Sequence, residues 1–269
     1  MPPDRALPEA VRAERRAYAL FFGALLLVVA LCTWGVAFNP FELFGKGDAF
    51  WTFLSEDFWP PRIPQREGRL EAILAGIGVT FAMAVASATV AAVLAFLVAL
   101  FASERVSPFP RLAPLVRGAA TFVRNIPALV WAFILFSSLG IGTGVGFVAL
   151  TLSSLAFLVR AFAETMEDLS QDGLESLLAI GATFPQRVAH GILPSCLGGF
   201  VSWYLYSLEV NIRASAVVGM VGGGGIGLVL FSYIKAFNYH VAFFIILLIA
   251  ALVIAVDWMT GRLRKELAL

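Results

Sequence analysis

The sequence predicts an all-α membrane protein with about six transmembrane helices. Of its 269 residues, 60% are hydrophobic and 14% are charged, and the mean hydropathy is +0.88. Soluble domains are on average about half apolar and a quarter charged. Six apolar runs have about the 20 residues that a helix needs to cross a hydrocarbon core of roughly 30 Å. We therefore expect a polytopic membrane protein.

The spans begin near the N-terminus. The first follows Arg15-Arg16, and because no small-residue cleavage site closes it, we expect an uncleaved anchor helix rather than a signal peptide. The second has 32 residues and, at about 1.5 Å per residue, should protrude from the membrane. The expected spans are Tyr18–Phe38, Leu70–Phe101, Thr121–Leu139, Phe147–Phe162, Leu197–Val218 and Val241–Met259.

The second span carries small residues at four-residue spacing, which places them in rows along a helix. Such rows let helices approach one another closely inside a membrane. They predict two packing surfaces on this span. The rows are Gly78, Ala82 and Ala86, and Ala84, Ala88 and Ala92.

Lysine and arginine residues are distributed unequally between the two sides of the membrane. With the N-terminus inside, the cytoplasmic segments hold 12 of the 19 and the outer segments hold 5; Arg160 and Arg213 fall within spans. The positive-inside rule then places both termini in the cytoplasm. The expected division is a cytoplasmic N-terminus (1–17), an anchor helix (18–38), a periplasmic segment (39–69), a membrane core (70–260) with a cytoplasmic hairpin (171–194), and a cytoplasmic C-terminus (261–269).

Several kinds of site find no support. The net charge of +1 argues against nucleic-acid binding, which needs a clustered basic surface. Cys32 and Cys196 lie far apart, and His190 and His240 lack the neighbouring ligands that a metal site needs. No nucleophile–base arrangement is evident either. We expect no catalytic residue, no metal site and no cofactor in this chain.

The segment ESLLAIGATFPQRVAHGILP (175–194) predicts a broken, semi-polar hairpin between two apolar spans. Asp172 and Glu175 fit a capping box that opens a first short helix. Thr183 and Gln186 fit a second box that opens a second helix.

Gly181, between the two helices, fits a left-handed helix stop, which costs little without a Cβ. Pro185 is allowed in the first turn of the second helix, and Pro194 is expected to end it. Docking into a partner protein and lying on the lipid surface both remain possible for the apolar face of the first helix. That face consists of Leu174, Leu177 and Leu178.

The hairpin resembles the EAA loop of ABC-importer permeases. Four other segments resemble the phosphonate-type branch of these permeases, whereas the first 65 residues match little. The EAA-like residues are Glu175, Gly181, Leu193 and Pro194, with Ser176 and Leu177 in place of two alanines and Ile192 one position late. The other segments are RNIPALVWAF (124–133), AFAETMEDL (161–169), LEVNIRASAVVGMVGGGGIG (208–227) and DWMTGRLRKEL (257–267).

The resemblance implies a type I ABC importer permease fold in a bacterial inner membrane. It implies a homodimer of this chain, two cytoplasmic ATPase subunits that bind ATP and Mg, and a periplasmic substrate-binding protein. The chain would be the permease and not an enzyme, and the cargo would be phosphonate or a related oxyanion (phosphite, hypophosphite or phosphate). The hairpin would be the coupling helix on the ATPase. Its coupling residues would be Glu175, Leu178, Gly181, Ala182, Thr183, Pro185, Leu193 and Pro194.

Three polar residues lie in the middle of the fifth span. A charge there costs about 2.5–3.5 kcal/mol on insertion scales, so these residues are functional candidates. At about 100° per residue, Glu209 and Arg213 share a face and can pair. Asn211 points nearly opposite and needs a partner on another helix or subunit. A structural ion pair and a pair that lines the translocation pathway both remain possible.

The run GMVGGGGIG (219–227) predicts a tight turn with close backbone approach at the outer end of the fifth span. It is no dinucleotide site or P-loop, because no strand precedes it and no Gly-Lys-Ser/Thr ends it. The resemblance places it beside the external gate, and a passive turn is the alternative. The residues assigned to the pathway or gate are Glu209, Asn211, Arg213, Ser215, Gly222, Gly223, Gly224 and Gly225.

Other functions remain open. The chain could serve an importer of another small solute, such as methionine or another amino acid. It could also be a self-sufficient secondary transporter or a membrane-embedded enzyme. Secondary transporters commonly show internal repeats and broken spans in matching halves. The sequence shows neither, and the hairpin favours a partnership with an ATPase.

Overall fold

The structure, a computed structural model, describes residues 9–36, 45–65, 68–169 and 171–267. Within these ranges the chain is almost entirely helical and contains no β-strand. Five of its helices are long and apolar enough to cross a membrane, or six spans if one bent helix pair counts as a span. The predicted all-α, polytopic class is therefore confirmed. The orientation of the termini stays a prediction.

The first of two units, Met1–Asp57, contains the apolar helix α1 (Glu9–Gly35) and the short helix α3 (Gly47–Thr52). The predicted first span ended at Phe38, whereas α1 ends at Gly35; positions 37–44 lie outside the described residues. The apolar stretch of α1 is long and hydrophobic enough to cross a membrane.

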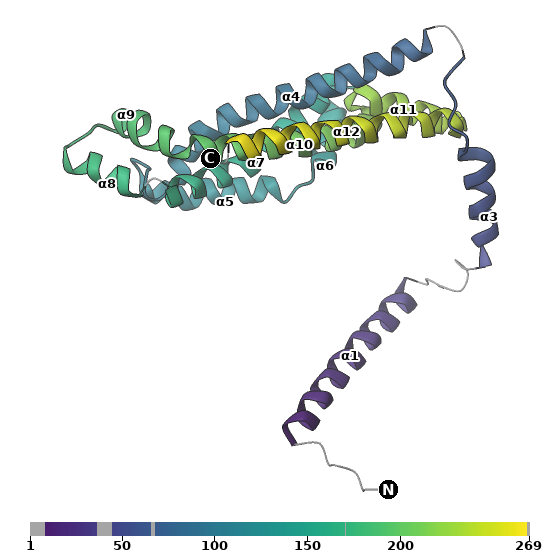
Figure 1. Cartoon of the computed structure of the whole chain (residues 1–269), viewed down its shortest axis with the longest axis horizontal. Coiled ribbons are helices and arrows are strands. Elements are labelled where there is room, and N and C mark those ends of the chain that lie inside the picture. Colours follow the sequence, from purple (N-terminus) through teal and green to yellow (C-terminus); the bar gives the residue numbers. More distant parts are fainter. Residues whose placement is uncertain (1–8, 37–44, 66–67, 170, 268–269) are drawn as a thin grey trace. The chain divides into compact units, whose positions relative to one another are not determined.

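The second unit, Phe58–Leu269, is built around four long helices that lie along one another (Figure 1). Helix α4 packs against α7 and α10, and α10 packs against α12. In one core cluster the rings of Phe162 on α7 and Phe200 on α10 are 4.7 Å apart, beside the buried Ala95 and Ala99 of α4. The long helices are α4 (Arg69–Ala102), α7 (Thr143–Leu169), α10 (Leu193–Val218) and α12 (Tyr239–Leu267).

One of the two predicted small-residue rows forms a packing surface. Ala84 and Ala88 are fully buried and lie in a cluster with Leu208 and Ile212 of α10. The other row is exposed along α4 in the described chain, so its packing role stays a prediction. Spacing alone identifies a row but does not identify the face that meets a neighbour. The exposed residues are Gly78, Ala82 and Ala86.

The predicted single span Thr121–Leu139 is wrong. Two helices, α5 (Ala113–Arg124) and α6 (Ala128–Leu139), meet there at a bend of 82°. The break follows from Pro127, which lacks an amide N–H and disfavours helical geometry at the residue before it. The described part of the chain therefore contains one broken helix pair.

A short helix follows the glycine run and was not predicted. After a turn over Gly219–Gly223, helix α11 (Gly225–Lys235) runs for 11 residues, about half of a transmembrane span. Its buried Ile226 and Leu230 pack with apolar residues of α4 and α12. The glycine run therefore connects two helices within the unit, instead of leading directly into the sixth span.

Candidate functional site

The hairpin begins with helix α8 (Gln171–Ala179), which ends as predicted. Gly181 has a φ of +76°, in the left-handed region. Its N–H donates to Leu178 O (3.0 Å), and the N–H of Ala182 donates to Leu177 O (3.0 Å). These two bonds form a Schellman motif and satisfy carbonyls at the end of the helix. The predicted left-handed helix stop is confirmed.

Helix α9 (Phe184–Arg187) opens with the predicted capping box. The backbone N–H and the hydroxyl of Thr183 both donate to Gln186 Oε1, at 2.8 and 2.9 Å. Pro185 lies in the first turn, where no intrahelical N–H bond is needed. The other proposed box stays a prediction, because the side chain of Asp172 lies outside the described residues.

The apolar face predicted for α8 is divided between two roles. Leu174 is buried in a core cluster. Leu177 packs closely over Gly191: a Cβ added to this glycine would lie 2.9 Å from Leu177 Cδ1. Leu178 is 51% exposed, and Ile180, which the sequence analysis did not single out, is 79% exposed. The hairpin is thus held to its own unit by Leu174 and Leu177, while two large apolar side chains at its tip stay uncovered.

Pro194 does not end the second helix of the hairpin, contrary to the prediction. The chain stays helical from α9 through a π-helical turn (Val188–Ile192) and into α10, with Pro194 in the first turn of α10. The wider π turn leaves room for the ring of Pro194 and tolerates the loss of one hydrogen bond, since proline has no N–H to donate. One helical run therefore leads from the elbow to the glycine turn; α8 and α9 lie at one end of this unit and α11 lies towards the other (Figure 1).

The buried carboxylate of Glu209 has more partners than the sequence suggested. Arg213 lies 3.9 Å from it, so the predicted pair is confirmed. However, Glu209 is 7% exposed and also accepts hydrogen bonds from Thr260 and Arg264 of α12. Arg213 lies 3.7 Å from Asp257, also on α12. The negative charges of Glu209 and Asp257 and the positive charges of Arg213 and Arg264 therefore offset one another between α10 and α12. The signal was present in DWMTGRLR (257–264), whose polar residues recur at helical spacing.

Asn211 meets other helices, as predicted. Its Oδ1 accepts from Ser154 of α7 (2.8 Å), and its Nδ2 donates to Ser87 of α4 (3.0 Å). The side chain is 2% exposed. Inside a membrane such amide bonds hold helices together. Ser215, also assigned to the pathway, donates to Ile212 O within its own helix (2.8 Å).

The glycine turn shows the predicted close approach. Gly224 has a φ of +78°, and a Cβ there would lie 2.8 Å from Thr143 Cγ2. Backbone contacts tie the turn to two other helices. The N–H of Gly142, just before α7, donates to Gly222 O (2.9 Å), and the N–H of Ile226 donates to Thr80 Oγ1 on α4 (2.8 Å). The turn is therefore connected to α4 and α7.

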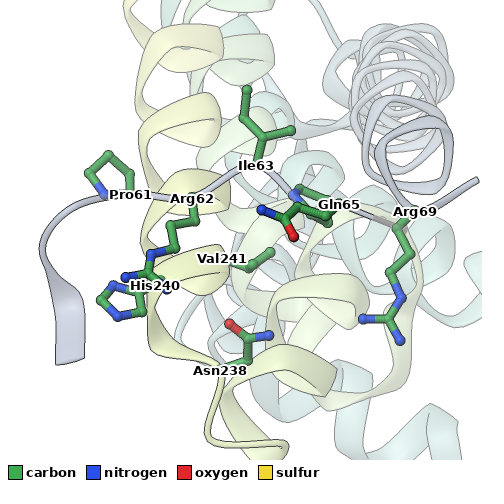
Figure 2. Close-up of a pocket in the computed structure, with 9 residues that line it drawn as sticks. Pro61, Arg62, Ile63, Gln65, Arg69, Asn238, His240 and Val241 are labelled. Atoms are coloured by element: carbon green, nitrogen blue, oxygen red, sulfur yellow. The ribbon is translucent and has the colours of Figure 1, made fainter. Parts of the chain in front are cut away.

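A basic pocket of about 650 Å³ lies where the segment before α4 crosses the start of α12 (Figure 2). The N–H of Arg62 donates to His240 O (3.1 Å). Figure 2 shows the Arg62 side chain beside the His240 ring, with Arg69 on the α4 side. These three groups carry the basic character, and the lining contains no carboxylate. Sequence analysis missed this pocket. Its lining residues are Pro61, Arg62, Ile63, Pro64, Gln65, Arg69, Asn238, His240 and Val241.

One family model and two known transport proteins match this chain over much of its length. A family model described as "Binding-protein-dependent transport system inner membrane component" matches residues 91–268. The chain is 35% identical over 187 residues to the phosphite transport system permease protein PtxC of Stutzerimonas stutzeri. The alignment covers 70% of this chain and 68% of that protein. It is also 29% identical over 230 residues to the phosphate-import permease protein PhnE of Mycolicibacterium smegmatis. This alignment covers 85% of this chain and 42% of that protein.

A solved structure is also similar. A chain of the MetNI methionine ABC transporter in an inward-facing conformation matches with a TM-score of 0.67 and 23% identity, over 76% of this chain and 99% of that one. At this identity the likeness concerns the fold. The predicted type I ABC importer permease fold is confirmed.

Proposed function

This chain belongs to the family of binding-protein-dependent transport system inner membrane components, and we propose that it is the permease subunit of an ATP-driven importer of a small phosphorus oxyanion. One structural observation carries the mechanism: a single helical run connects the exposed elbow to the glycine turn. A displacement at the elbow would move α10 along its length, because helical backbone transmits axial motion better than a loop does.

The exposed tip of the hairpin supports a protein partner at this end of the chain. Leu178 and Ile180 extend beyond the core, beside the exposed Glu175. An apolar pair on a short helix is suited to a groove in another protein. We assign that groove to a cytoplasmic ATPase subunit, which would bind ATP and Mg, so that this chain itself needs no cofactor.

The remaining partners follow from the family. A binding protein on the outer side would deliver the cargo, and a second permease chain would complete the pathway in a bacterial inner membrane. The second chain is either a copy of this one or a related permease. The role of the Glu209–Arg213 pair and of the glycine turn in the pathway or gate belongs to the same proposal.

Two observations support a phosphorus oxyanion as the cargo. Three relatives that align over 70% or more of this chain are named for phosphite or phosphate transport. In addition, the pocket formed with Arg62, Arg69 and His240 carries basic groups without a carboxylate. A basic concave surface raises the local concentration of anions.

Reconstitution tests this function. The chain, co-expressed with a candidate ATPase, is placed in proteoliposomes with a phosphite-loaded binding protein outside and ATP inside. We expect phosphite uptake that requires ATP and the binding protein. Uptake by the chain alone, without ATP, would overturn the assignment. Uptake of methionine in place of any phosphorus oxyanion would overturn the proposed cargo.

A further inference from the structure

A polar junction joins the ends of three helices next to the hairpin. Glu167 lies in the last turn of α7 and belongs to the AFAETMEDL segment (161–169), to which no role has been given so far. Its Oε1 accepts hydrogen bonds from the N–H of Glu104 (2.8 Å) and the hydroxyl of Ser103 (3.3 Å), directly after α4. The same oxygen accepts a hydrogen bond from Arg117 of α5 (2.5 Å). We call this set of contacts the Glu167 junction.

Arg117 completes the junction. Its Nη2 donates to Glu167, and its Nε donates to Ala102 O (2.6 Å), so one guanidinium connects α5 both to α7 and to the last residue of α4. Ala102 and Ser103 are fully buried, and the side chains of Arg117 and Glu167 are 30% and 21% exposed. Hydrogen bonds between charged groups are shorter and stronger than neutral ones, and partial burial reduces their screening by salt. The three helix ends are therefore held in one arrangement.

The junction lies at the base of the hairpin. Helix α7 ends at Leu169 and α8 begins at Gln171, so the first arm of the hairpin follows the junction closely. Leu174 of α8 is buried in the same core cluster as Met166 of α7 and Ala102 of α4. A displacement of the elbow therefore acts on α10 through the second arm of the hairpin and on the junction through the first arm.

Helices α5 and α6 lead from the junction to the glycine turn. They meet at a bend of 82°, across which the indole N–H of Trp131 on α6 donates to Val123 O on α5 (3.5 Å). Trp131 also packs in a core cluster with Val218, which directly precedes the glycine turn. Further along α6, Phe136 Cδ2 would lie 3.0 Å from a Cβ added to Gly222. Helix α6 therefore packs against the turn.

We propose that Arg117 and Glu167 are positioning residues for coupling, which give the elbow a second connection to the glycine turn, through α5 and α6. The first connection is the helical run through α10. This inference rests on the proposed function, in which an ATPase moves the elbow. Packed side chains, ion pairs and rigid helices can carry such coupling between distant sites. Because α6 and α10 both contact the turn, two connections make it respond to the elbow as one unit.

The test uses the assembled importer in proteoliposomes and measures phosphite uptake per ATP hydrolysed. We expect Arg117→Gln to keep the ATPase bound and active, while uptake per ATP falls at least about fivefold, the lower end of typical coupling between sites. Glu167→Gln should have the same effect. The double variant should lose no more than either single variant, because the two residues act together. A purely structural role would lower uptake and ATP hydrolysis in proportion, and this result would overturn the proposal.

Arg117→Lys keeps the proposal testable if Arg117→Gln does not assemble. Lysine retains the positive charge beside Glu167 but lacks the planar fork that reaches Glu167 and Ala102 O together. We therefore expect uptake per ATP below that of the wild type and above that of Glu167→Gln. Wild-type coupling in the Lys variant and in Glu167→Gln would overturn the positioning role.

Two matched controls accompany these variants. Glu164→Gln removes an acid about one turn earlier on α7, which is paired with Arg160 of the same helix. Arg111→Gln removes an exposed arginine before α5 that forms no ion pair within the described part of the chain. Both should keep wild-type uptake per ATP hydrolysed. Equal losses in Glu164→Gln and Glu167→Gln would contradict the junction.

If the wild type imports no phosphorus oxyanion, the proposed function fails, and the junction is tested without cargo. Ile141→Cys places a thiol just after α6, at an exposed position near Gly222. Cys32→Ser removes the exposed native thiol and leaves the buried Cys196. The rate of modification by N-ethylmaleimide is then compared between the nucleotide-free and the vanadate-trapped complex with the ATPase.

We expect this rate to differ between the two states when the junction is intact and to be the same in both states in Arg117→Gln. Such a result would support the second connection even without a known cargo. A difference that persists in Arg117→Gln, or no difference with the intact junction, would overturn it.

Discussion

Arg264, on α12, donates a hydrogen bond to the carboxylate of Glu209, on α10, and lies closer to it than Arg213 does on Glu209's own helix. The buried acid is therefore neutralised mainly by a residue 55 positions away. Arg213 is 53% exposed at its side chain and is shared with Asp257.

This arrangement makes the two arginines unequal. Arg264→Gln removes the nearest cation from a carboxylate that is 7% exposed; because the Arg264 side chain is itself 34% exposed, we expect a cost below the roughly 3–5 kcal/mol of a fully buried pair. Arg213→Gln leaves Glu209 with Arg264 and Thr260, so we expect a loss within about 1 kcal/mol. Thermal unfolding of the purified chain in detergent measures the difference. The change Glu209→Gln should recover much of the stability of Arg264→Gln. Equal destabilisation by the two single variants would contradict this ranking.

An uptake assay separates the two hypotheses for Arg213, a structural ion pair and a residue that lines the pathway. Because its removal should leave the fold intact, uptake by Arg213→Gln reports directly on the pathway. Lost uptake in a stable, assembled complex would support a pathway role. Normal uptake would leave Arg213 as a structural residue.

Gly181 provides a test of the elbow. A Cβ at this position meets nothing within 4 Å, so Gly181→Leu acts through its φ of +76°, which costs about 1–2 kcal/mol for an ordinary residue. We expect weaker binding of the ATPase and loss of uptake, with membrane insertion retained. Gly181→Asn is the matched control, since asparagine tolerates this conformation. Normal uptake in Gly181→Leu would refute the coupling role of the elbow.

The exposed tip can be tested without affecting the core. Changing Leu178 and Ile180 together to serine removes apolar surface that is already exposed, so the stability of the isolated chain should change by less than about 0.5 kcal/mol. We expect the ATPase to dissociate during purification and uptake to fall. Leu263→Ser, an exposed apolar position on α12, serves as the control. Retention of the ATPase by the double variant would place the contact elsewhere.

The glycine turn is tested by valine at Gly223 and Gly224. A Cβ at Gly223 would lie 2.8 Å from Val218 O, and Gly224 has the positive φ that β-branched residues avoid. We expect lost uptake or ATP hydrolysis without transport, while the complex still assembles. Gly144→Val, where a Cβ meets nothing within 4 Å, should behave as wild type. If the double variant transports like the wild type and its transport stays coupled to ATP hydrolysis, the turn is passive.

Much of the hairpin and of the span pattern was determined by the sequence itself. The left-handed stop at Gly181 and the capping box at Thr183 depend on residues within five positions, so their spacing is sufficient to predict them. The long apolar runs similarly identify membrane helices, because a bilayer needs a minimum length. Even the bend at Pro127, which was missed, had a local signal in its proline.

The tertiary structure decided which helix faces meet. Helical periodicity places Glu209 and Arg213 on one face, but it does not indicate that α12 covers that face with Arg264. Nor does it indicate that Asn211 of α10 bonds to Ser87 of α4 and to Ser154 of α7. Such contacts arise from the packing of segments far apart in the chain, where the pairing depends on the shape and polarity of every neighbouring helix together.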